Sequence, residues 1–253
     1  MLLSVKGLTA GYGGAQALHG VDLEVDEGEI VSVLGANGAG KTTTLRAISS
    51  VIRAWSGEME FAGRRLDRQP PEARAALGLG HLPEGRGILA TLTVEENLLL
   101  GATVRRDGSA AYRRDRERML ELFPALGDKL KQHASALSGG QQQMLGMARA
   151  LLGRPRLLMV DELSFGLAPI VVDELFRLVR EIRQDGTAFL LVEQSAGVLS
   201  ASDRSYVISG GRTVLEGRSS ELRQQGAGQL ARVYLGAGSA QGGKSTIGRG
   251  GTG

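Results

Sequence analysis

Residues 31–48 read "VSVLGANGAGKTTTLRAI", in which an apolar run is followed by a glycine-rich turn and then by residues that favour a helix. The turn fits the spacing G-x-x-x-x-G-K-T between Gly35 and Thr42. Glycines in such a turn let backbone N–H groups converge on phosphate oxygens, and the helix that follows directs the positive end of its dipole toward them. The stretch therefore predicts a strand, a phosphate-binding loop and a helix that begins at Lys41.

The phosphate loop (residues 35–42) supplies the candidate contacts to a nucleotide. Lys41 brings a point charge to the outer phosphates, and the hydroxyl of Thr42 can coordinate Mg²⁺. The candidate binding residues are Gly35, Ala36, Asn37, Gly38, Ala39, Gly40, Lys41, Thr42 and Thr43. Residues 238–245 fit the same spacing, but no strand precedes them and no helix follows, so we expect no phosphate site there.

A second stretch, "RLLMVDELSFGLAP" at residues 156–169, ends an apolar run on two adjacent carboxylates. A strand that simply leaves the core with charged residues would have the same pattern. With a nucleotide on the phosphate loop, however, Asp161 at the end of a neighbouring strand would reach Mg²⁺ or its waters. Glu162 would then lie beside the water that attacks the terminal phosphoryl group.

Strand-like runs alternate with helical stretches along the chain. Near-continuous apolar runs at 29–35, 156–162 and 188–194 are each followed by a helical segment, which is typical of a parallel sheet covered on both faces. Shorter alternating runs at 2–8, 21–28 and 57–63 predict flanking antiparallel strands. We expect an inserted helical subdomain at about 85–150 and a flexible glycine- and serine-rich tail at 237–253, which makes residues 1–236 one α/β domain.

Composition excludes several classes of function. The chain has 253 residues, of which 42% are hydrophobic, so it can bury a sizeable core. It has no cysteine, which excludes disulfides and thiolate metal sites, and its net charge of +3 is spread along the sequence, which argues against a nucleic-acid partner. No signal peptide is recognisable, and no apolar run approaches the roughly 18 residues needed to span a bilayer. We expect a cytoplasmic protein that reaches a membrane only through a partner.

The segment "ASALSGGQQQMLGMARALLGRP" at residues 134–155 contains "LSGGQ" directly before an amphipathic helix. Lying between the phosphate loop and "VDE", it resembles the signature of the ABC ATPase family. The resemblance spans residues 2 to about 235 and implies a P-loop NTPase core with a parallel sheet, a flanking antiparallel β-subdomain and an inserted helical subdomain. It also implies that two ATP-binding subunits pair head to tail, so that the signature residues Ser138, Gly139, Gly140 and Gln141 cover ATP bound to the partner. Tyr12 matches the position whose aromatic ring stacks on adenine.

Three residues differ from the commonest family pattern and resemble the smaller ATP-binding subunit of branched-chain amino acid importers. They are Glu84 in "HLPEGRGI", Ala168 in "SFGLAP" and Gln194 in "LLVEQSAG". The resemblance implies that Glu84 is a ligand of Mg²⁺ with Thr42 and Asp161. It also implies that Gln194 acts in catalysis with Glu162. Three other residues depart from that subfamily too, and one of them is Leu163, which stands where proline usually follows the catalytic glutamate. Its presence would loosen the backbone beside Glu162 and puts catalytic efficiency in question.

The resemblance implies an ATPase that energises an importer for branched-chain amino acids, with ATP and Mg²⁺ as cofactors. It further implies a second ATP-binding subunit, two membrane permease chains, an indirect link to an extracytoplasmic solute-binding protein, and a place at the cytoplasmic face of the membrane. Three alternatives remain open: an importer for another small solute such as urea or amides, a soluble ABC protein of translation or DNA repair, and a nucleotide-binding module without hydrolysis.

Overall fold

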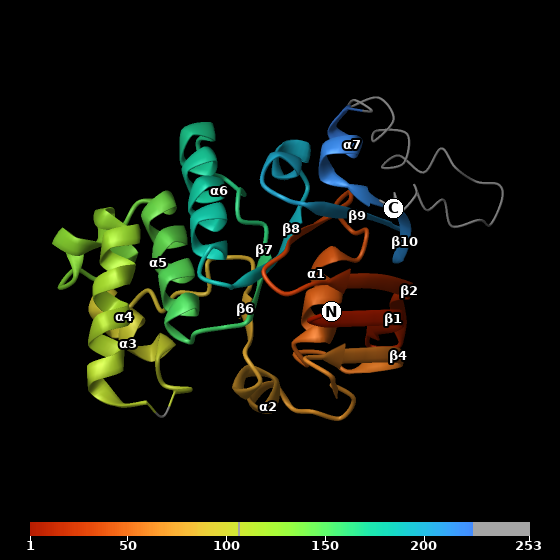
Figure 1. Cartoon of the computed structure of the whole chain (residues 1–253), viewed down its shortest axis with the longest axis horizontal. Coiled ribbons are helices and arrows are strands. Elements are labelled where there is room, and N and C mark those ends of the chain that lie inside the picture. The colour runs from red at the N-terminus through yellow and green to blue at the C-terminus, as the bar shows by residue number, and fades with distance from the viewer. Residues whose placement is uncertain (106, 225–253) are drawn as a thin grey trace, which may run out of the picture.

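The computed structural model describes residues 1–105 and 107–224, which form two sheets with helices around them (Figure 1). The larger sheet has six strands in the order β10-β9-β3-β8-β7-β6. These are β3 (Ile30–Leu34), β6 (Leu79–Leu82), β7 (Leu157–Asp161), β8 (Ala188–Glu193), β9 (Arg204–Ser209) and β10 (Arg212–Arg218). All neighbours pair in parallel except β9 and β10, which pair antiparallel.

The central strands β3, β7 and β8 of the larger sheet are buried on both faces, as the near-continuous apolar runs predict. On β3, Ile30 and Leu34 pack into one hydrophobic core, whereas Val31 and Val33 pack into a second core on the opposite face. The predicted strands at 29–35, 156–162 and 188–194 are confirmed to within two residues at either end. The strands β6, β9 and β10 were not expected from the sequence.

The smaller sheet is antiparallel and lies beside the larger one. Its strands are β1 (Leu3–Tyr12), β2 (Ala15–Val25), β4 (Ala54–Phe61) and β5 (Arg64–Arg65), in the order β2-β1-β4-β5. Helix α1 (Lys41–Ile48) packs Leu45, Ala47 and Ile48 into the core that both sheets share. The helix that follows the phosphate loop is therefore held between two sheets.

A buried arginine from a neighbouring helix caps the C-terminal end of α1. Arg74 of α2 (Pro71–Ala76) donates to the carbonyl oxygens of Ala47 and Ile48 at 3.0 and 2.6 Å. The last carbonyls of a helix lack partners within it, and their partial negative charge favours a cation. Arg74 thus stabilises the end of α1 that points away from the phosphate loop.

A helical lobe stands apart from the smaller sheet (Figure 1). The expected helical segment at 85–150 contains α3 (Val94–Gly101), α4 (Gly108–Leu122), the short 3-10 helices at Pro124–Lys129 and Ala134–Ala136, and α5 (Gly139–Leu152). Beyond it lie α6 (Pro169–Arg183), a 3-10 helix at Ala196–Ser200, and α7 (Ser219–Gln224). The second glycine-rich match at 238–245 and the predicted tail fall outside the described residues.

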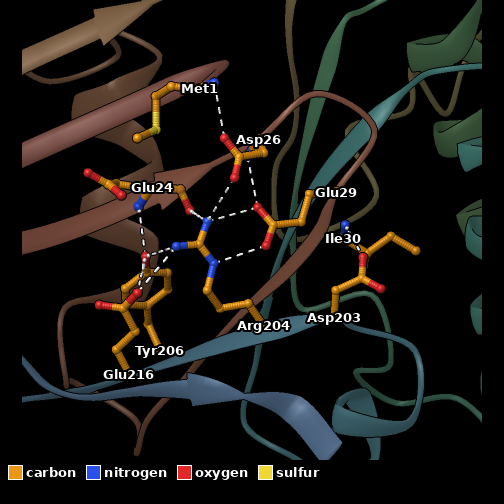
Figure 2. A network of polar contacts seen from close by, with 9 residues as sticks. All are labelled: Met1, Glu24, Asp26, Glu29, Ile30, Asp203, Arg204, Tyr206 and Glu216. Atoms are coloured by element: carbon orange, nitrogen blue, oxygen red, sulfur yellow. Dashed lines mark hydrogen bonds and ion pairs between the residues drawn. The ribbon is translucent and has the colours of Figure 1, made fainter. Parts of the chain in front are cut away.

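A polar network joins the two sheets near the N-terminus (Figure 2). The guanidinium of Arg204 on β9 donates to both carboxylate oxygens of Glu29 at 2.9 Å and to Glu216 on β10 at 3.2 Å. It also donates to the carbonyl oxygen of Glu24 on β2 and to the hydroxyl of Tyr206. The side chains of Arg204 and Glu29 are only 18% and 15% exposed, so the pair is largely shielded from solvent.

Replacing Arg204 tests whether this network holds the sheets together. The change Arg204→Met leaves two carboxylates without their cation, and we expect the free energy of unfolding to fall by about 3 kcal/mol. Arg65→Met removes the same charge from an exposed pair with Asp67 and should leave the free energy of unfolding close to that of wild type. Urea unfolding of the nucleotide-free chain measures both, and equal losses would contradict the role given to Arg204.

Candidate functional site

Three strand ends meet at one edge of the larger sheet. In the parallel register, Leu34 at the end of β3 lies beside Glu193 at the end of β8, and Val192 lies beside Asp161 at the end of β7. The segments that follow the three strands therefore leave the sheet side by side. They carry the phosphate loop, the acidic pair and Gln194, which is the grouping that the sequence predicts.

Close packing fixes the path of the phosphate loop. A β-carbon at Gly35 would lie 2.4 Å from the carbonyl oxygen of Ile208, and one at Gly40, where φ is +108°, would lie 2.7 Å from Cδ2 of Leu18. Only glycine fits at both positions. The remaining candidates divide by burial: Asn37 and Gly38 are exposed, Ala36 and Thr42 are half-buried, and Ala39 and Thr43 are buried. The tip of the loop is thus open to a ligand while its two ends are fixed.

Lys41 lies almost fully buried at the start of α1. Its Nζ donates to the carbonyl oxygens of the first two loop residues at 2.9 and 3.2 Å, so the side chain spans the loop. Burial lowers the pKa of Lys41, and the nearby carboxylates of Glu162, Asp161 and Glu193 act in the opposite direction. The loop therefore holds a buried cation that donates to two carbonyl oxygens and is influenced by three nearby carboxylates.

Asp161 is a buried carboxylate next to the loop. It is 2% exposed, and Oγ1 of Thr42 donates to its Oδ1 at 3.2 Å. Burial raises the pKa of Asp161 to about 6, and the carboxylates of Glu162 and Glu84 raise it further. The hydrogen bond from Thr42 and the charge of Arg46 lower this pKa only in part, so the ionised form of Asp161 stays unfavourable, a condition that a divalent metal ion would relieve.

The residues around Asp161 fit Mg²⁺ delivered with a nucleotide. Mg²⁺ takes oxygen ligands, keeps several waters and is usually held by one or two carboxylates together with substrate phosphates. The hydroxyl of Thr42 and the carboxylate of Asp161 are in contact, and Glu84 is close enough to affect the pKa of Asp161. Within residues 1–105 and 107–224, no group of three or more acidic, histidine or cysteine side chains forms a metal cluster by itself.

Glu162 has an unusual backbone conformation. Its φ is +51°, in the left-handed region, and its N–H donates to the carbonyl oxygen of Val192 at 2.9 Å. The next residue, Leu163, is 1% exposed and packs into the hydrophobic core. A proline at that position would bias Glu162 toward an extended conformation. Leucine therefore permits the backbone geometry seen here and anchors the turn through its side chain.

A second buried carboxylate, Glu193, fixes the turn after Glu162. The backbone N–H of Ser164 donates to one of its oxygens at 2.9 Å and the hydroxyl of Ser164 to the other at 2.7 Å. Burial raises the pKa of Glu193. The sequence analysis did not identify Glu193, although its signal was present: "AFLLVEQ" ends an apolar run on an acid, as the stretch before Asp161 does.

The other predicted residues lie on the rim of the site. Gln194 directly follows β8, Glu84 lies two residues after β6, and both are exposed. Tyr12 ends β1, where its ring is 43% exposed and its hydroxyl accepts a hydrogen bond from Arg46 of α1 at 3.2 Å. Tyr12 therefore presents an aromatic face that a flat, apolar ring could cover.

The signature forms the start of α5. Ser138 caps this helix: its hydroxyl accepts from the N–H of Gln141 at 3.3 Å, and the side chain of Gln141 accepts from the N–H of Ser138 at 3.1 Å. The next two N–H groups, those of Gly139 and Gly140, have no partner within the helix. Helix α5 belongs to the lobe that stands apart from α1, so the signature and the phosphate loop of one chain do not form one site (Figure 1).

Comparison with known proteins agrees with this geometry. The family model described as ABC transporter matches residues 18–164. The chain is 41% identical over 224 residues to the high-affinity branched-chain amino acid transport ATP-binding protein BraG of Pseudomonas aeruginosa, covering 87% of this chain and 94% of that protein. It is 34% identical over 238 residues to the lipopolysaccharide export system ATP-binding protein LptB of Escherichia coli K12, covering 92% of this chain and 97% of that protein.

Solved structures show the same fold. An ATP-binding subunit of an ABC transporter superposes with a TM-score of 0.80 at 30% identity, covering 93% of this chain and 99% of that one. An ATP-binding cassette of an ABC transporter in its ADP conformation superposes with a TM-score of 0.81 at 26% identity, covering 93% and 98%. No helix in the described part of this chain is long and apolar enough to cross a membrane. The chain belongs to the ABC transporter family, as one of its ATP-hydrolysing ATP-binding proteins.

Proposed function

We propose that this chain is the ATP-hydrolysing subunit of an importer for branched-chain amino acids. The observation that carries the proposal is the 41% identity to BraG over nearly the full length of both proteins. The residues Glu84, Ala168 and Gln194, which resemble the same subfamily, agree with this proposal. The similarity to LptB favours lipopolysaccharide export as a second candidate.

In this proposal ATP lies along the phosphate loop. The ring of Tyr12 stacks on adenine, and the exposed N–H groups at the tip of the loop take the phosphate oxygens. Lys41 exchanges the loop carbonyls that it now contacts for the outer phosphates, which relieves the burial of its charge. Thr42, Asp161 and Glu84 would hold Mg²⁺, which would supply positive charge to offset the charge that develops on the phosphates.

Hydrolysis then needs one base and well-placed charge, because phosphoryl transfer to water requires little covalent help from the protein. Glu162 accepts the proton of the attacking water. Its turn is fixed by the bond from its N–H to Val192 and by the two bonds from Ser164 to Glu193. Gln194, which follows Glu193 directly, offers an amide donor to the terminal phosphate.

Each ATP is completed by the signature of a second ATP-binding subunit. The free N–H groups of Gly139 and Gly140 and the hydroxyl of Ser138 form a helix-start anion site that the chain's own phosphate loop does not reach. A head-to-tail pair of subunits brings phosphate to this site from outside. The two composite sites would therefore form only when both loops are loaded.

An apolar surface on the helical lobe supports docking to membrane permease chains. Leu99, Leu100 and Val104 lie at the end of α3 and just after it, and each is at least 38% exposed, as is Leu89 in the segment before that helix. Exposed apolar side chains that gather on one face mark interaction surfaces, and these four lie within 16 residues of one another in the sequence. Through two permease chains the subunit would act at the cytoplasmic face of the membrane and would receive solute indirectly from an extracytoplasmic binding protein.

The role given to Asp161 predicts that removing its charge stabilises the nucleotide-free chain and weakens the stabilisation that Mg-ATP confers. Because its folded-state pKa is raised to about 6 from an ordinary value of 3.8, ionisation opposes folding, and the free energy of unfolding falls as pH rises through this window. Asp161→Asn keeps an oxygen for Thr42 and removes the charge. We expect the nucleotide-free variant to be more stable than wild type by about 1 to 3 kcal/mol at pH 7.5 and by less at pH 5. Mg-ATP should stabilise the variant much less than wild type.

Chemical unfolding at the two pH values, with and without Mg-ATP, measures these effects. Asp185→Asn is the matched control, because Asp185 is exposed and pairs with Arg118 at the surface. That control should follow wild type under all four conditions. A loss of stability in Asp161→Asn that is the same at both pH values would contradict a buried, uncompensated carboxylate.

Uptake assays test the proposed transport function. Cells that lack this chain should lose high-affinity uptake of leucine, isoleucine and valine while uptake of urea and amides is unchanged. Wild-type chain should restore uptake, and Lys41→Ala should not, because the outer phosphates lose their point charge. Loss of urea or amide uptake alone, or a defect in lipopolysaccharide export with normal amino acid uptake, would refute the branched-chain assignment.

A further inference from the structure

Arg86 is an arginine for which the structure shows no charged partner. It lies in the segment between β6 and α3, two residues after Glu84, and is half-buried. Its Nη1 donates to Oε1 of Gln142 on α5. Among the residues that the structure describes, no carboxylate forms an ion pair with it. A partly buried guanidinium with five donors and one neutral acceptor is left with unused charge and unused donors.

The guanidinium of Arg86 lies against the first residue of the signature helix. A β-carbon on Gly139 would be 2.9 Å from its Nη2 and 3.5 Å from its Cζ. The start of α5 already carries the partial positive charge of the helix dipole, so a cation there is unfavourable by itself. Two like charges held together in this way are stabilised by an anion that binds between them.

The position of Arg86 is fixed by its backbone. Its φ is +70°, and its carbonyl oxygen would lie 2.3 Å from a β-carbon on Gly146, so the segment packs directly against α5 at a position where only glycine fits. The guanidinium of Arg149 on the same helix donates to the carbonyl oxygen of Gly87. The amide of Gln142 is held in turn by the carbonyl oxygen of Ala134 at 3.1 Å. Arg86 therefore reaches the signature from a segment that is fastened to α5.

We propose that Arg86 is a phosphate-binding residue that acts between subunits: its guanidinium contacts the terminal phosphate of the ATP held by the phosphate loop of the partner. The inference rests on the proposed function, because it needs the head-to-tail pair. Arg86 then supplies a full charge where the signature supplies only N–H groups and one hydroxyl. ADP lacks the terminal phosphate and leaves Arg86 unsatisfied, so the residue favours association with ATP over association with ADP.

The same segment would serve both sites of the pair. In the proposed function Glu84 would contribute to the metal site of its own chain, whereas Arg86, two residues later, would face the ATP of the partner. A shift of this segment relative to α5 would therefore change both sites together. This is a consequence of the short spacing between the two residues and of the close packing at Gly146.

Substitutions at Arg86 separate charge from structure. Arg86→Gln keeps a donor for Gln142 and removes the charge, whereas Arg86→Lys keeps the charge and loses the planar fork. Arg65→Gln removes the same charge from the antiparallel sheet, where Arg65 is exposed and pairs with Asp67, and controls for net charge. For each full-length chain, light scattering with Mg-free ATP or ADP measures association, and a fluorescent ATP analogue at high dilution measures binding by the single chain.

We expect Arg86→Gln to bind the analogue as wild type does. Its ATP-dependent association should need at least about tenfold more protein, because removing one charge-assisted hydrogen bond weakens affinity by about that factor. Arg86→Lys should recover most of that loss, and Arg65→Gln should match wild type. Association of Arg86→Gln at the protein concentration that wild type needs would overturn the inference. Equally weakened association of Arg86→Gln and Arg86→Lys would also overturn it, because that result indicates a packing role for the side chain. Failure of wild-type chain to associate with ATP would instead refute the composite site, and the inference with it.

Discussion

The structure depends above all on the parallel register of β3, β8 and β7. This register places the phosphate loop, Asp161 and Glu193 at one edge of a sheet that is buried on both faces, so ionisable groups end strands whose other residues are apolar. Burial there opposes ionisation of the acids and protonation of Lys41, and the opposite charges offset one another only in part. The charged groups at this edge of the sheet are thus incompletely neutralised, and phosphate together with a divalent cation would neutralise them. An ATPase with such a site favours its substrate complex over the empty site.

Much of this arrangement follows from local sequence, because the decisive features are local. The turn at 35–42 needs glycines whatever surrounds it, and short, mostly apolar runs such as β3 and β8, each followed by a helical segment, favour buried strands. The four-residue β6, "LGHL", has no such signal, since it is a strand only because β7 pairs with it. The role of Leu163 was also beyond sequence reasoning: a missing proline reads as a loss of restraint, whereas the structure shows a buried leucine beside a left-handed Glu162. The positions of Glu193 and Arg86 depend on contacts with residues far along the chain.

The two halves of the proposed mechanism lie in separate parts of the molecule. In the proposal, the strand ends carry the groups that would bind ATP and activate water. The start of α5 carries groups that would stabilise phosphate brought by another subunit. The segment at 83–88 connects them, because it leaves the sheet edge at β6 and packs on α5 at Gly146. If the proposal holds, one short, closely packed stretch of chain joins nucleotide binding at one site to subunit pairing at the other. The exposed apolar residues Leu99 and Val104 follow later in the same helical lobe.

The central claim is that Glu162, held at the end of β7, is the base that activates water for ATP hydrolysis. The most direct test is the Mg-ATPase rate of the assembled transporter containing Glu162→Gln, measured beside wild type together with the ATP retained by each. The amide keeps the shape and hydrogen bonding of the side chain but cannot accept the proton. The account predicts that turnover falls by at least about 10²-fold while ATP remains bound. Hydrolysis at the wild-type rate by Glu162→Gln would show that Glu162 is not the base and would contradict the mechanism.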